Sequence, residues 1–312
     1  EASSSPAWRS RVHREHAVCT ALAALHLHQR ERHYLVRDGR VQIIDQATGR
    51  VAAGRVWSDG LQQLVELKEG CTTSPAMATL AQLTYQRFFP RYVRLGGVSG
   101  TLCEARSELL ATYGLSVRRV PLRRRCRRRV GPTYLFAGHD ALGAAVAVRF
   151  AQLPAQARPV LVATDSVADA QALSERLHAG GLPHALLHAS NDEAEAEVVA
   201  RAGQRGAITV TTNIAGRGTD IELGPVVPAL GGLHVICCQL NSARRIDRQL
   251  AGRAARQGDP GSVETMLSLD SALLARAWPA RWRAGARRLA TALPSWAVRL
   301  LARAPQWAEE NS

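Results

Sequence analysis

Residues 159–181, PVLVATDSVADAQALSERLHAGG, decide the fold of this 312-residue chain. They begin with an unbroken apolar run, Pro159–Thr164, and continue with a helical pattern, Val167–His178. Ser166 is placed to cap the helix, and Gly180–Gly181 end it with residues that tolerate positive φ. A strand without polar alternation is typical of a parallel sheet that helices cover on both faces. The stretch therefore predicts one repeat of an α/β fold.

The same alternation of apolar run and helical pattern fills residues 130–268. The other candidate strands are Thr133–Ala137, Ala185–His188, Ala207–Thr212, Leu233–Cys238 and Val263–Leu269. The other candidate helices are Asp140–Gln152, Glu193–Ala202 and Ala243–Arg256. Strands that alternate with helices predict an α/β parallel sheet. Such sheets bind ligands beyond the carboxyl ends of their strands, so we expect the site there.

The composition bounds the class of protein. The chain is 46% hydrophobic, which suffices for substantial cores and about two domains. No stretch approaches the roughly 20 apolar residues of a membrane span. Six cysteines form no C-x-x-C pair and have no histidine at metal-ligand spacing, so no metal site is predicted and a reduced, cytosolic setting is indicated. The first residue is Glu rather than Met, and we expect a segment of something longer.

The formal net charge of +14 comes almost entirely from arginine. A basic surface favours anionic partners such as nucleic acid, acidic lipid headgroups or nucleotides. An arginine-for-lysine bias of the coding sequence explains the same charge without any partner. The charge alone therefore does not decide the function.

The first part of the chain, before the α/β region, has a different pattern of apolar and polar residues. Tyr34–Asp45 (YLVRDGRVQIID) alternates apolar and polar residues around Asp38–Gly39, which predicts a hairpin with a primed turn. Helical patterns cover Arg14–Arg32, Trp57–Glu69 and Thr79–Leu95, and Gly96–Thr101 forms a tight loop. This part is therefore expected to be a partial α+β segment.

Two arginine-rich stretches lie outside these patterns. Arg118–Arg129 (RRVPLRRRCRRR) is expected to be an exposed linker, because that much like charge resists burial. A contact with nucleic acid or lipid is the alternative. The tail from Arg276 carries tryptophans among arginines and is interrupted by prolines. Short helices that pack against the domain are favoured there, and a membrane-surface helix is the alternative.

The first block with candidate chemistry is Thr211–Gly224, TTNIAGRGTDIELG. Gly216 and Gly218 permit a close approach of the backbone to a ligand. Asp220 can accept hydrogen bonds from ribose hydroxyls, as acidic residues do in dinucleotide folds. Arg217 can link the nucleotide to a neighbouring lobe. An ordinary turn is the alternative for the G-R-G sequence alone.

The second block is RRIDRQLAGRAARQGDPGS, Arg244–Ser262. Gln249, Arg253 and Arg256 fall at i, i+4 and i+7, so on one helix they share a face. Two permanently charged guanidinium groups there suit the γ-phosphate of a nucleotide, where such arginines stabilise charge on the transferring oxygens. The alternative is a solvated basic helix end, which the helix dipole favours.

The sequence contains no element that would cradle the phosphates. A P-loop needs Lys beside Ser or Thr after a glycine-rich turn, and the single lysine, Lys68, is followed by Glu69. We therefore expect half of an ATP-driven machine, which by itself binds ATP weakly and hydrolyses it negligibly.

Together these motifs resemble the SecA family, the ATPase motors of bacterial protein export. The TNIAGRGTDI and RRIDRQLAGRAARQGDPGS sequences carry most of the resemblance. Further matches keep the order of the family along the chain and lie at Tyr34–Asp45, Thr48–Arg50, Trp57–Leu61, Lys68–Gly70, Thr79–Ala81, Thr84–Gln86, Gly100–Thr101, Pro159–Gly224 and Gly231–Ser262.

The resemblance implies a RecA-like second lobe and roles for single residues. Arg253 and Arg256 would be the arginine fingers, with Gln249 as their companion. The loop that contacts the nucleotide would hold Gly216, Arg217, Gly218 and Asp220. ATP and Mg²⁺ would be held largely by a first lobe that this sequence lacks.

The resemblance also implies domains and partners. The domains would be the end of a preprotein cross-linking domain (1–56), a re-entrant part of the first nucleotide-binding domain (57–120), a basic linker (121–129), the second nucleotide-binding domain (130–268) and a helical tail (269–312). The partners would be a SecY-type channel and secretory preproteins, at the inner face of the cytoplasmic membrane. An anionic membrane surface and a homodimer are further possible partners, and no specific nucleic acid is expected.

Departures from the family pattern indicate a divergent or accessory member. Arg253–Ala254–Ala255–Arg256 stands where the family usually has Arg-Ser-Gly-Arg, and Pro121–Arg125 replaces a Pro-Thr-Asn-Arg-Pro linker. Two other classes of function stay open. One is a non-catalytic basic module that binds a partner or membrane. The other is a helicase-like lobe, which the aromatic content of 5% disfavours.

Overall fold

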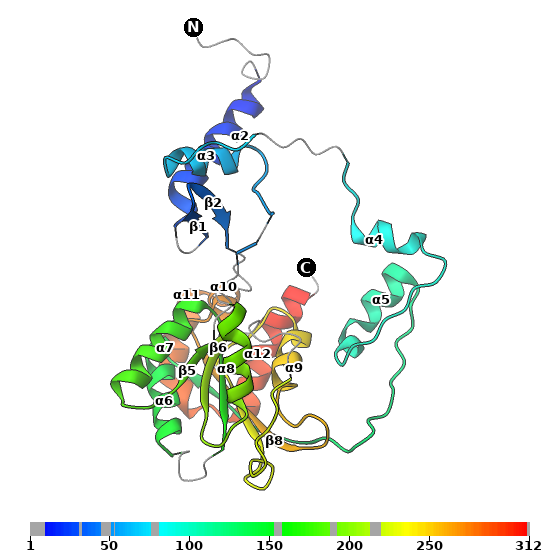
Figure 1. Ribbon diagram of the computed structural model, residues 1–312, viewed down its shortest axis with the longest axis vertical. Helices are drawn as coiled ribbons and strands as arrows, with labels where there is room; N and C mark the ends of the chain where they lie inside the picture. Colours follow the sequence, from blue (N-terminus) through cyan, green and yellow to red (C-terminus); the bar gives the residue numbers. More distant parts are fainter. Residues whose placement is uncertain are drawn as a thin grey trace. The chain divides into compact units, whose positions relative to one another are not determined.

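The computed structural model describes residues 10–30, 33–44, 51–52, 54–75, 81–152, 158–187, 192–212 and 220–310. The chain divides into two compact units, residues 1–83 and residues 84–312 (Figure 1). Each unit is described by itself below.

The first unit is a small α+β unit built on the predicted hairpin. β1 pairs with β2 in antiparallel register, and Asp38 and Gly39 between them have φ of 52° and 66°. Positive φ at both central residues defines the primed turn that the Asp-Gly sequence predicted. The core is formed by Ala24, Tyr34, Val41 and Val65. The elements are α2 (Arg11–Leu22), a π-helical turn (Ala23–Leu27), β1 (Tyr34–Arg37), β2 (Arg40–Ile43) and α3 (Leu61–Lys68).

The second unit opens with short helices before its sheet. The helix predicted for Thr79–Leu95 is wrong: α4 is a single turn, Tyr85–Phe88, followed by a 3₁₀ turn, Phe89–Arg91. Pro90 explains the early end, because proline lacks the amide that continues an α-helix and disfavours helical backbone before it. A 3₁₀ turn (Leu102–Ala105) and α5 (Arg106–Tyr113) follow.

A six-stranded sheet forms the centre of the second unit. All pairings are parallel, in the order β3-β8-β7-β4-β6-β5, which confirms the predicted fold class. The strands are β3 (Arg127–Phe136), β4 (Val160–Thr164), β5 (Ala185–Leu187), β6 (Ile208–Thr212), β7 (Leu233–Cys237) and β8 (Pro260–Ser268). The helices between them are α6 (His139–Gln152), α7 (Val167–Ala179), α8 (Asp192–Ala202) and α9 (Arg244–Ala251).

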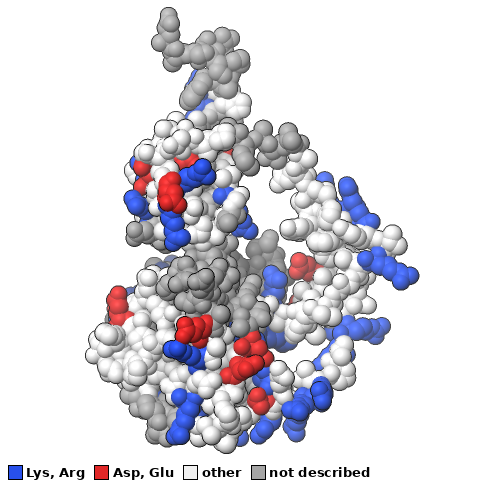
Figure 2. All heavy atoms as spheres, in the orientation of Figure 1, with Lys and Arg blue, Asp and Glu red and all other residues white. Residues whose placement is uncertain are grey.

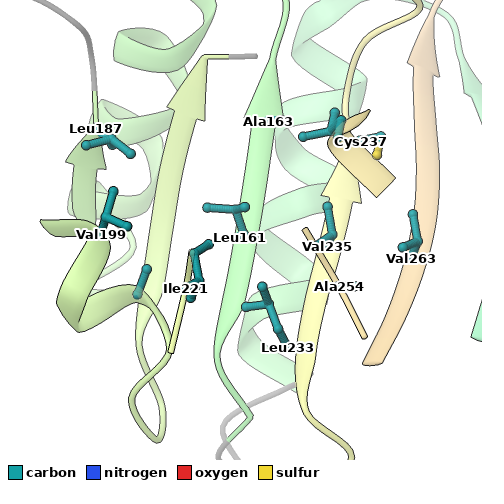
Figure 3. Packing of buried hydrophobic residues seen from close by; sticks show 12 residues of the cluster. Leu161, Ala163, Leu187, Val199, Ile221, Leu233, Val235, Cys237, Ala254 and Val263 are labelled. Atoms are coloured by element: carbon teal, nitrogen blue, oxygen red, sulfur yellow. The ribbon is translucent and has the colours of Figure 1, made fainter. Parts of the chain in front are cut away.

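Helices cover both faces of the sheet because the strands are apolar on both. In β4, Leu161 and Ala163 pack into the cluster that α8 and α9 cover (Figure 3). Val160 and Val162 point to the other face, where α6 and α7 pack. All five residues of β4 are buried. The hydrophobic effect on both faces therefore fixes the central strand, as the unbroken apolar run predicted.

The C-terminal helices pack against the sheet domain, as predicted for the tail. Ser295 Oγ accepts a hydrogen bond of 2.8 Å from the Thr133 amide, and Arg299 donates to the Gly131 carbonyl at 2.6 Å. Leu274 and Val298 are buried with residues of β3 and β8. The helices are α10 (Ala272–Ala277), α11 (Ala280–Leu289) and α12 (Ser295–Glu310), with a 3₁₀ turn at Ala290–Ala292. Within the described ranges, no helix is long and apolar enough to cross a membrane.

One buried carboxylate ties strand β8 to its neighbours. The side chain of Glu264 is 5% exposed and accepts two hydrogen bonds from Arg149, of 3.0 and 2.7 Å. It also accepts one of 3.1 Å from His234 Nε2 on β7. Burial opposes ionisation, but the bonds from His234 and Arg149 outweigh it and lower the pKa of Glu264 from 4.5 to about 2. These hydrogen bonds therefore favour the charged form of Glu264.

We expect Glu264→Gln to lower the free energy of unfolding by about 3 kcal/mol at pH 7, because the change leaves Arg149 without its buried counter-charge. Urea denaturation measures the difference, with Glu175→Gln on the exposed face of α7 as the control. The difference in free energy of unfolding between the native chain and the variant is complete above pH 4.5. It is lost as the pH falls toward 2, because Glu264 takes up its proton in the unfolded chain before it does so in the folded one. An equal difference at pH 3 and pH 7 would contradict the assignment.

Candidate nucleotide site

The predicted arginine helix ends earlier than expected. α9 stops at Ala251, so Gln249 lies on the helix while Arg253 and Arg256 follow it. Gly252 takes the C-cap, and Ala255 has φ of 57°, which a right-handed helix cannot contain. The expectation that all three side chains share one helix face is therefore wrong.

The turn after α9 instead directs Arg256 toward Asp220. Arg256 Nε donates to the Gly252 carbonyl at 2.9 Å, and its Nη1 lies 2.7 Å from Asp220 Oδ1. Gln257 Nε2 donates to the second carboxylate oxygen at 3.3 Å. Two predicted site residues from separate blocks thus form one ion pair, and Gln257 is a third member that sequence reasoning missed. Gln257 lies within the second block, but no spacing in the sequence singled it out.

This ion pair is accessible to solvent. The side chains of Arg256 and Asp220 are 36% and 42% exposed. Burial opposes ionisation of Asp220, but hydrogen bonds from Arg256 and Gln257 outweigh it and lower its pKa below 3.8. A pair this exposed contributes little to stability. Either side chain can therefore leave the ion pair and bind a ligand at a low cost in free energy.

The pair does not lie where the fold class predicted. Arg256 and Gln257 come just before β8, and the turn that carries them touches the amino-terminal start of this strand. A Cβ atom on Gly261 would lie 2.6 Å from the Ala255 amide nitrogen. The site therefore lies beside the start of β8, on the face that α8 and α9 cover, rather than beyond the carboxyl ends of the strands.

The other predicted site residues divide into two groups. Gly216, Arg217 and Gly218 lie outside the described residues. Gln249 is exposed on the last turn of α9, and Arg253 is half-buried in the turn that follows. Asp220 and Arg256 are in direct contact with each other.

The arginine tract also reaches this turn. Its exposure is confirmed, but its last residues, from Arg127, already form β3. Arg124 Nη1 donates to the Gln257 carbonyl at 3.4 Å, and Arg128 Nε donates to the Ala254 carbonyl at 3.1 Å. A pocket of about 440 Å³ lies between the tract and the turn. The sequence predicted only a linker for this tract, because its composition does not show that it contacts the turn after α9.

The next question is whether side chains of the described residues could bind a metal ion. Where residues are described, no group of three or more His, Cys, Asp or Glu side chains could hold a metal ion. The chemistry that the site offers is therefore that of guanidinium donors beside one carboxylate. Such a set fits the phosphate and ribose groups of a nucleotide.

Comparison with known proteins identifies the class. Residues 126–229 and 225–289 match the SecA P-loop domain, and residues 5–66 match the SecA preprotein cross-linking domain. The parallel sheet thus lies within the match to the SecA P-loop domain. Because the P-loop domain match spans more than half of the 312 residues, the chain belongs to the SecA family.

Individual relatives agree with this assignment. SecA 3 of Magnetococcus marinus is 46% identical over 274 residues, which cover 88% of this chain and 42% of that protein. SecA 2 of the same bacterium is 41% identical over 307 residues, 98% of this chain and 47% of that protein. SecA 2 of Nitrosospira multiformis is 46% identical over 266 residues, covering 85% and 40%. The chain spans under half of the length of these relatives.

Solved helicase structures are similar in fold. The Escherichia coli DEAD-box protein SrmB is 19% identical with a TM-score of 0.39, covering 49% of this chain and 88% of that chain. Domain 2 of the DEAD-box helicase Mss116p is 17% identical with a TM-score of 0.37, covering 59% and 77%. These likenesses concern the fold alone.

The ion pair yields a prediction for the carboxylate. We expect Arg256→Gln to raise the pKa of Asp220, because the change removes the charge and the hydrogen bond that oppose the cost of burial. Titration of the Asp220 carboxyl carbon by NMR measures this pKa. Arg248→Gln is the matched control, since Arg248 pairs with Glu104 at 2.8 Å instead. An equal shift in both variants would contradict the local pairing.

The turn yields a second prediction. We expect Ala255→Gly to stabilise the chain by about 1 kcal/mol, because a left-handed backbone at a residue with a Cβ costs roughly 1–2 kcal/mol that glycine avoids. Ala254→Gly is the control, since Ala254 lies in the core with negative φ and should lose stability on the change. Urea denaturation compares the two, and stabilisation by both or by neither would contradict the left-handed turn.

Proposed function

We propose that this chain supplies the second nucleotide-binding lobe of a SecA-type ATPase that couples ATP hydrolysis to protein translocation across the cytoplasmic membrane. The observation that carries the proposal is the ion pair between Asp220 and Arg256, which unites the two motif blocks in one site. Membership of the SecA family and the names of the relatives as protein translocase subunits support it.

The residues present fit one side of ATP. Asp220 accepts hydrogen bonds, as ribose hydroxyls require, and Arg256 presents a planar set of N–H donors suited to phosphate oxygens. We assign Arg256 and Arg253 as the arginine fingers and Gln249 as their companion. When bound, ATP supplies the phosphoryl group whose hydrolysis drives the motor.

The arginines act by holding positive charge where negative charge grows on the phosphate oxygens. The Gly252 carbonyl orients the Arg256 guanidinium through Nε, so little rearrangement is needed when a phosphate replaces the carboxylate. We further assign Gly216, Arg217 and Gly218 to nucleotide contact and Arg217 to coupling of the two lobes.

We propose that a first lobe provides the phosphate cradle and the acidic ligands of Mg²⁺. No P-loop sequence occurs in this chain, and the relatives are more than twice as long as the segment that matches. The segment before the sheet supports such a neighbour. Tyr85, Val93 and Val98 there are 72%, 100% and 98% exposed, and clustered exposed apolar side chains mark contact surfaces.

The proposed partners follow from the family. The match of residues 5–66 to a preprotein cross-linking domain supports binding of secretory preproteins, and a SecY-type channel would receive them. The site of action would be the inner face of the cytoplasmic membrane. We propose the domain limits given from the sequence, with the second lobe at 130–268, except that this lobe begins with β3 at Arg127.

A second candidate function is a non-catalytic module that binds an anionic membrane. The observation that favours it is the exposure of Trp282, Trp296 and Trp307, each above 60%, on helices that also carry arginine. Under this alternative the chain binds anionic vesicles and adds nothing to ATP turnover.

The test joins this chain to the N-terminal lobe of the Magnetococcus marinus SecA 3 and measures ATP turnover. We expect turnover in the joined protein and a loss of about 10³-fold or more in Arg256→Ala, because an arginine finger contributes roughly 10³–10⁵ in rate. Arg248→Ala is the matched control, since its side chain pairs with Glu104. Turnover that Arg256→Ala leaves unchanged would contradict the assigned role.

A further inference from the structure

A basic pocket lies beside the proposed nucleotide site and shares Arg256 and Gln257 with it, whereas its arginines from the linker tract have no role in that site. Its volume is about 440 Å³, within the range of roughly 300–1,000 Å³ of small-molecule sites. Figure 2 shows blue side chains gathered along this margin of the sheet domain, near β8 in Figure 1. The lining residues are Leu122, Arg123, Arg124, Cys126, Arg128, Ala255, Arg256, Gln257 and Gly258.

Backbone carbonyls hold three of the four arginines of the pocket in place. Arg124 and Arg128 donate to the carbonyls of Gln257 and Ala254, and Arg256 donates to that of Gly252. Each of these bonds uses one of the five N–H groups of a guanidinium. The remaining donors are thus presented on oriented groups, which is how arginine binds phosphate in a bidentate manner.

Gly258 allows the Arg124 side chain to pack against the backbone at one side of the pocket. Gly258 has φ of 90°, and a Cβ atom there would lie 2.8 Å from Cδ of Arg124. The stem of Arg124 therefore packs across the backbone of the turn. This close approach depends on the absence of a side chain at position 258.

The positive charge of the pocket is not neutralised by the described residues that line it. Among the described residues that line it there are four guanidinium groups and no carboxylate. Asp220 pairs with Arg256 from beside the pocket. Like charges held this close repel one another, so a ligand with several negative charges relieves more repulsion than a single charge does.

From this arrangement we propose that the pocket binds a compact anion with several phosphate groups. The chemistry is shared by soluble inorganic polyphosphate and by the phosphomonoester headgroup of a lipid. The site rests on Arg123, Arg124 and Arg128 of the linker tract, which the nucleotide site does not use. Because Arg256 lines the pocket as well, an occupant competes with Asp220 for it.

The test measures binding of inorganic tripolyphosphate to the full chain by calorimetry at 0.15 M salt, without ATP or a first lobe. We expect Arg123→Ala with Arg124→Ala to weaken binding at least tenfold. The matched control is Arg118→Ala with Arg119→Ala, which removes the same charge from the exposed start of the tract and should change binding less than twofold. An equal loss in both double variants, or no binding by the native chain, would overturn the proposal.

A charge-neutral variant and a chemical probe test the same pocket. Gly258→Ala keeps the net charge but displaces Arg124, and we expect it to weaken binding as well. Tripolyphosphate should slow alkylation of Cys126, which lines the pocket, and leave the exposed Cys103 unchanged. Equal protection of the two thiols would contradict binding in the pocket.

Vesicles identify the source of the phosphate. If phosphatidic acid vesicles bind the chain and tripolyphosphate displaces them, the occupant is a lipid headgroup. If tripolyphosphate binds and these vesicles do not, the occupant is soluble. Either result supports the pocket. Failure of all these measurements would overturn it and leave the proposed ATPase function untouched, because that function is measured by turnover of the joined protein.

Discussion

The close contact between the turn after α9 and the start of β8 controls both the core and the site. Gly261 allows the backbone of Ala255 to reach the strand, since a Cβ there would be 2.6 Å from the Ala255 nitrogen. This contact places Ala254 in the core beneath α9, where it is fully buried. The next side chain that can face outward is Arg256. Packing of a small residue therefore fixes the position of a charged one.

The strands of the sheet and the hairpin of the first unit could be predicted from the sequence. The strands were predictable because burial on both faces demands unbroken apolar runs, and β4 occupies almost the same residues as the run Pro159–Thr164. The hairpin was predictable because Asp38–Gly39 tolerates positive φ. Both signals are local, and each reports a requirement of the residues that carry it.

The end of α9 was not predictable in this way. The sequence from Ala243 to Arg256 contains good helix formers, and Ala255 by propensity continues a helix. Its left-handed backbone is imposed by tertiary contact with β8, which no local pattern reports. The resemblance to the family implies glycine at this position, and the conformation at Ala255 gives a physical reason, since glycine adopts positive φ without a steric penalty. Asp220 and Arg256, which the sequence singled out, are in contact, but the helix predicted to carry Arg256 ends at Ala251.

Arg256 is the residue through which the two inferred ligands affect each other. Its observed partner is Asp220, and the proposed nucleotide phosphate and the proposed anion of the basic pocket would be two more. One guanidinium cannot satisfy all three, so occupancy of the pocket should oppose the use of Arg256 in catalysis, and binding of nucleotide should oppose occupancy. The linker arginines are what this chain has in place of the family's usual linker. They therefore offer a physical route by which a divergent member of the family would become sensitive to phosphate-rich anions.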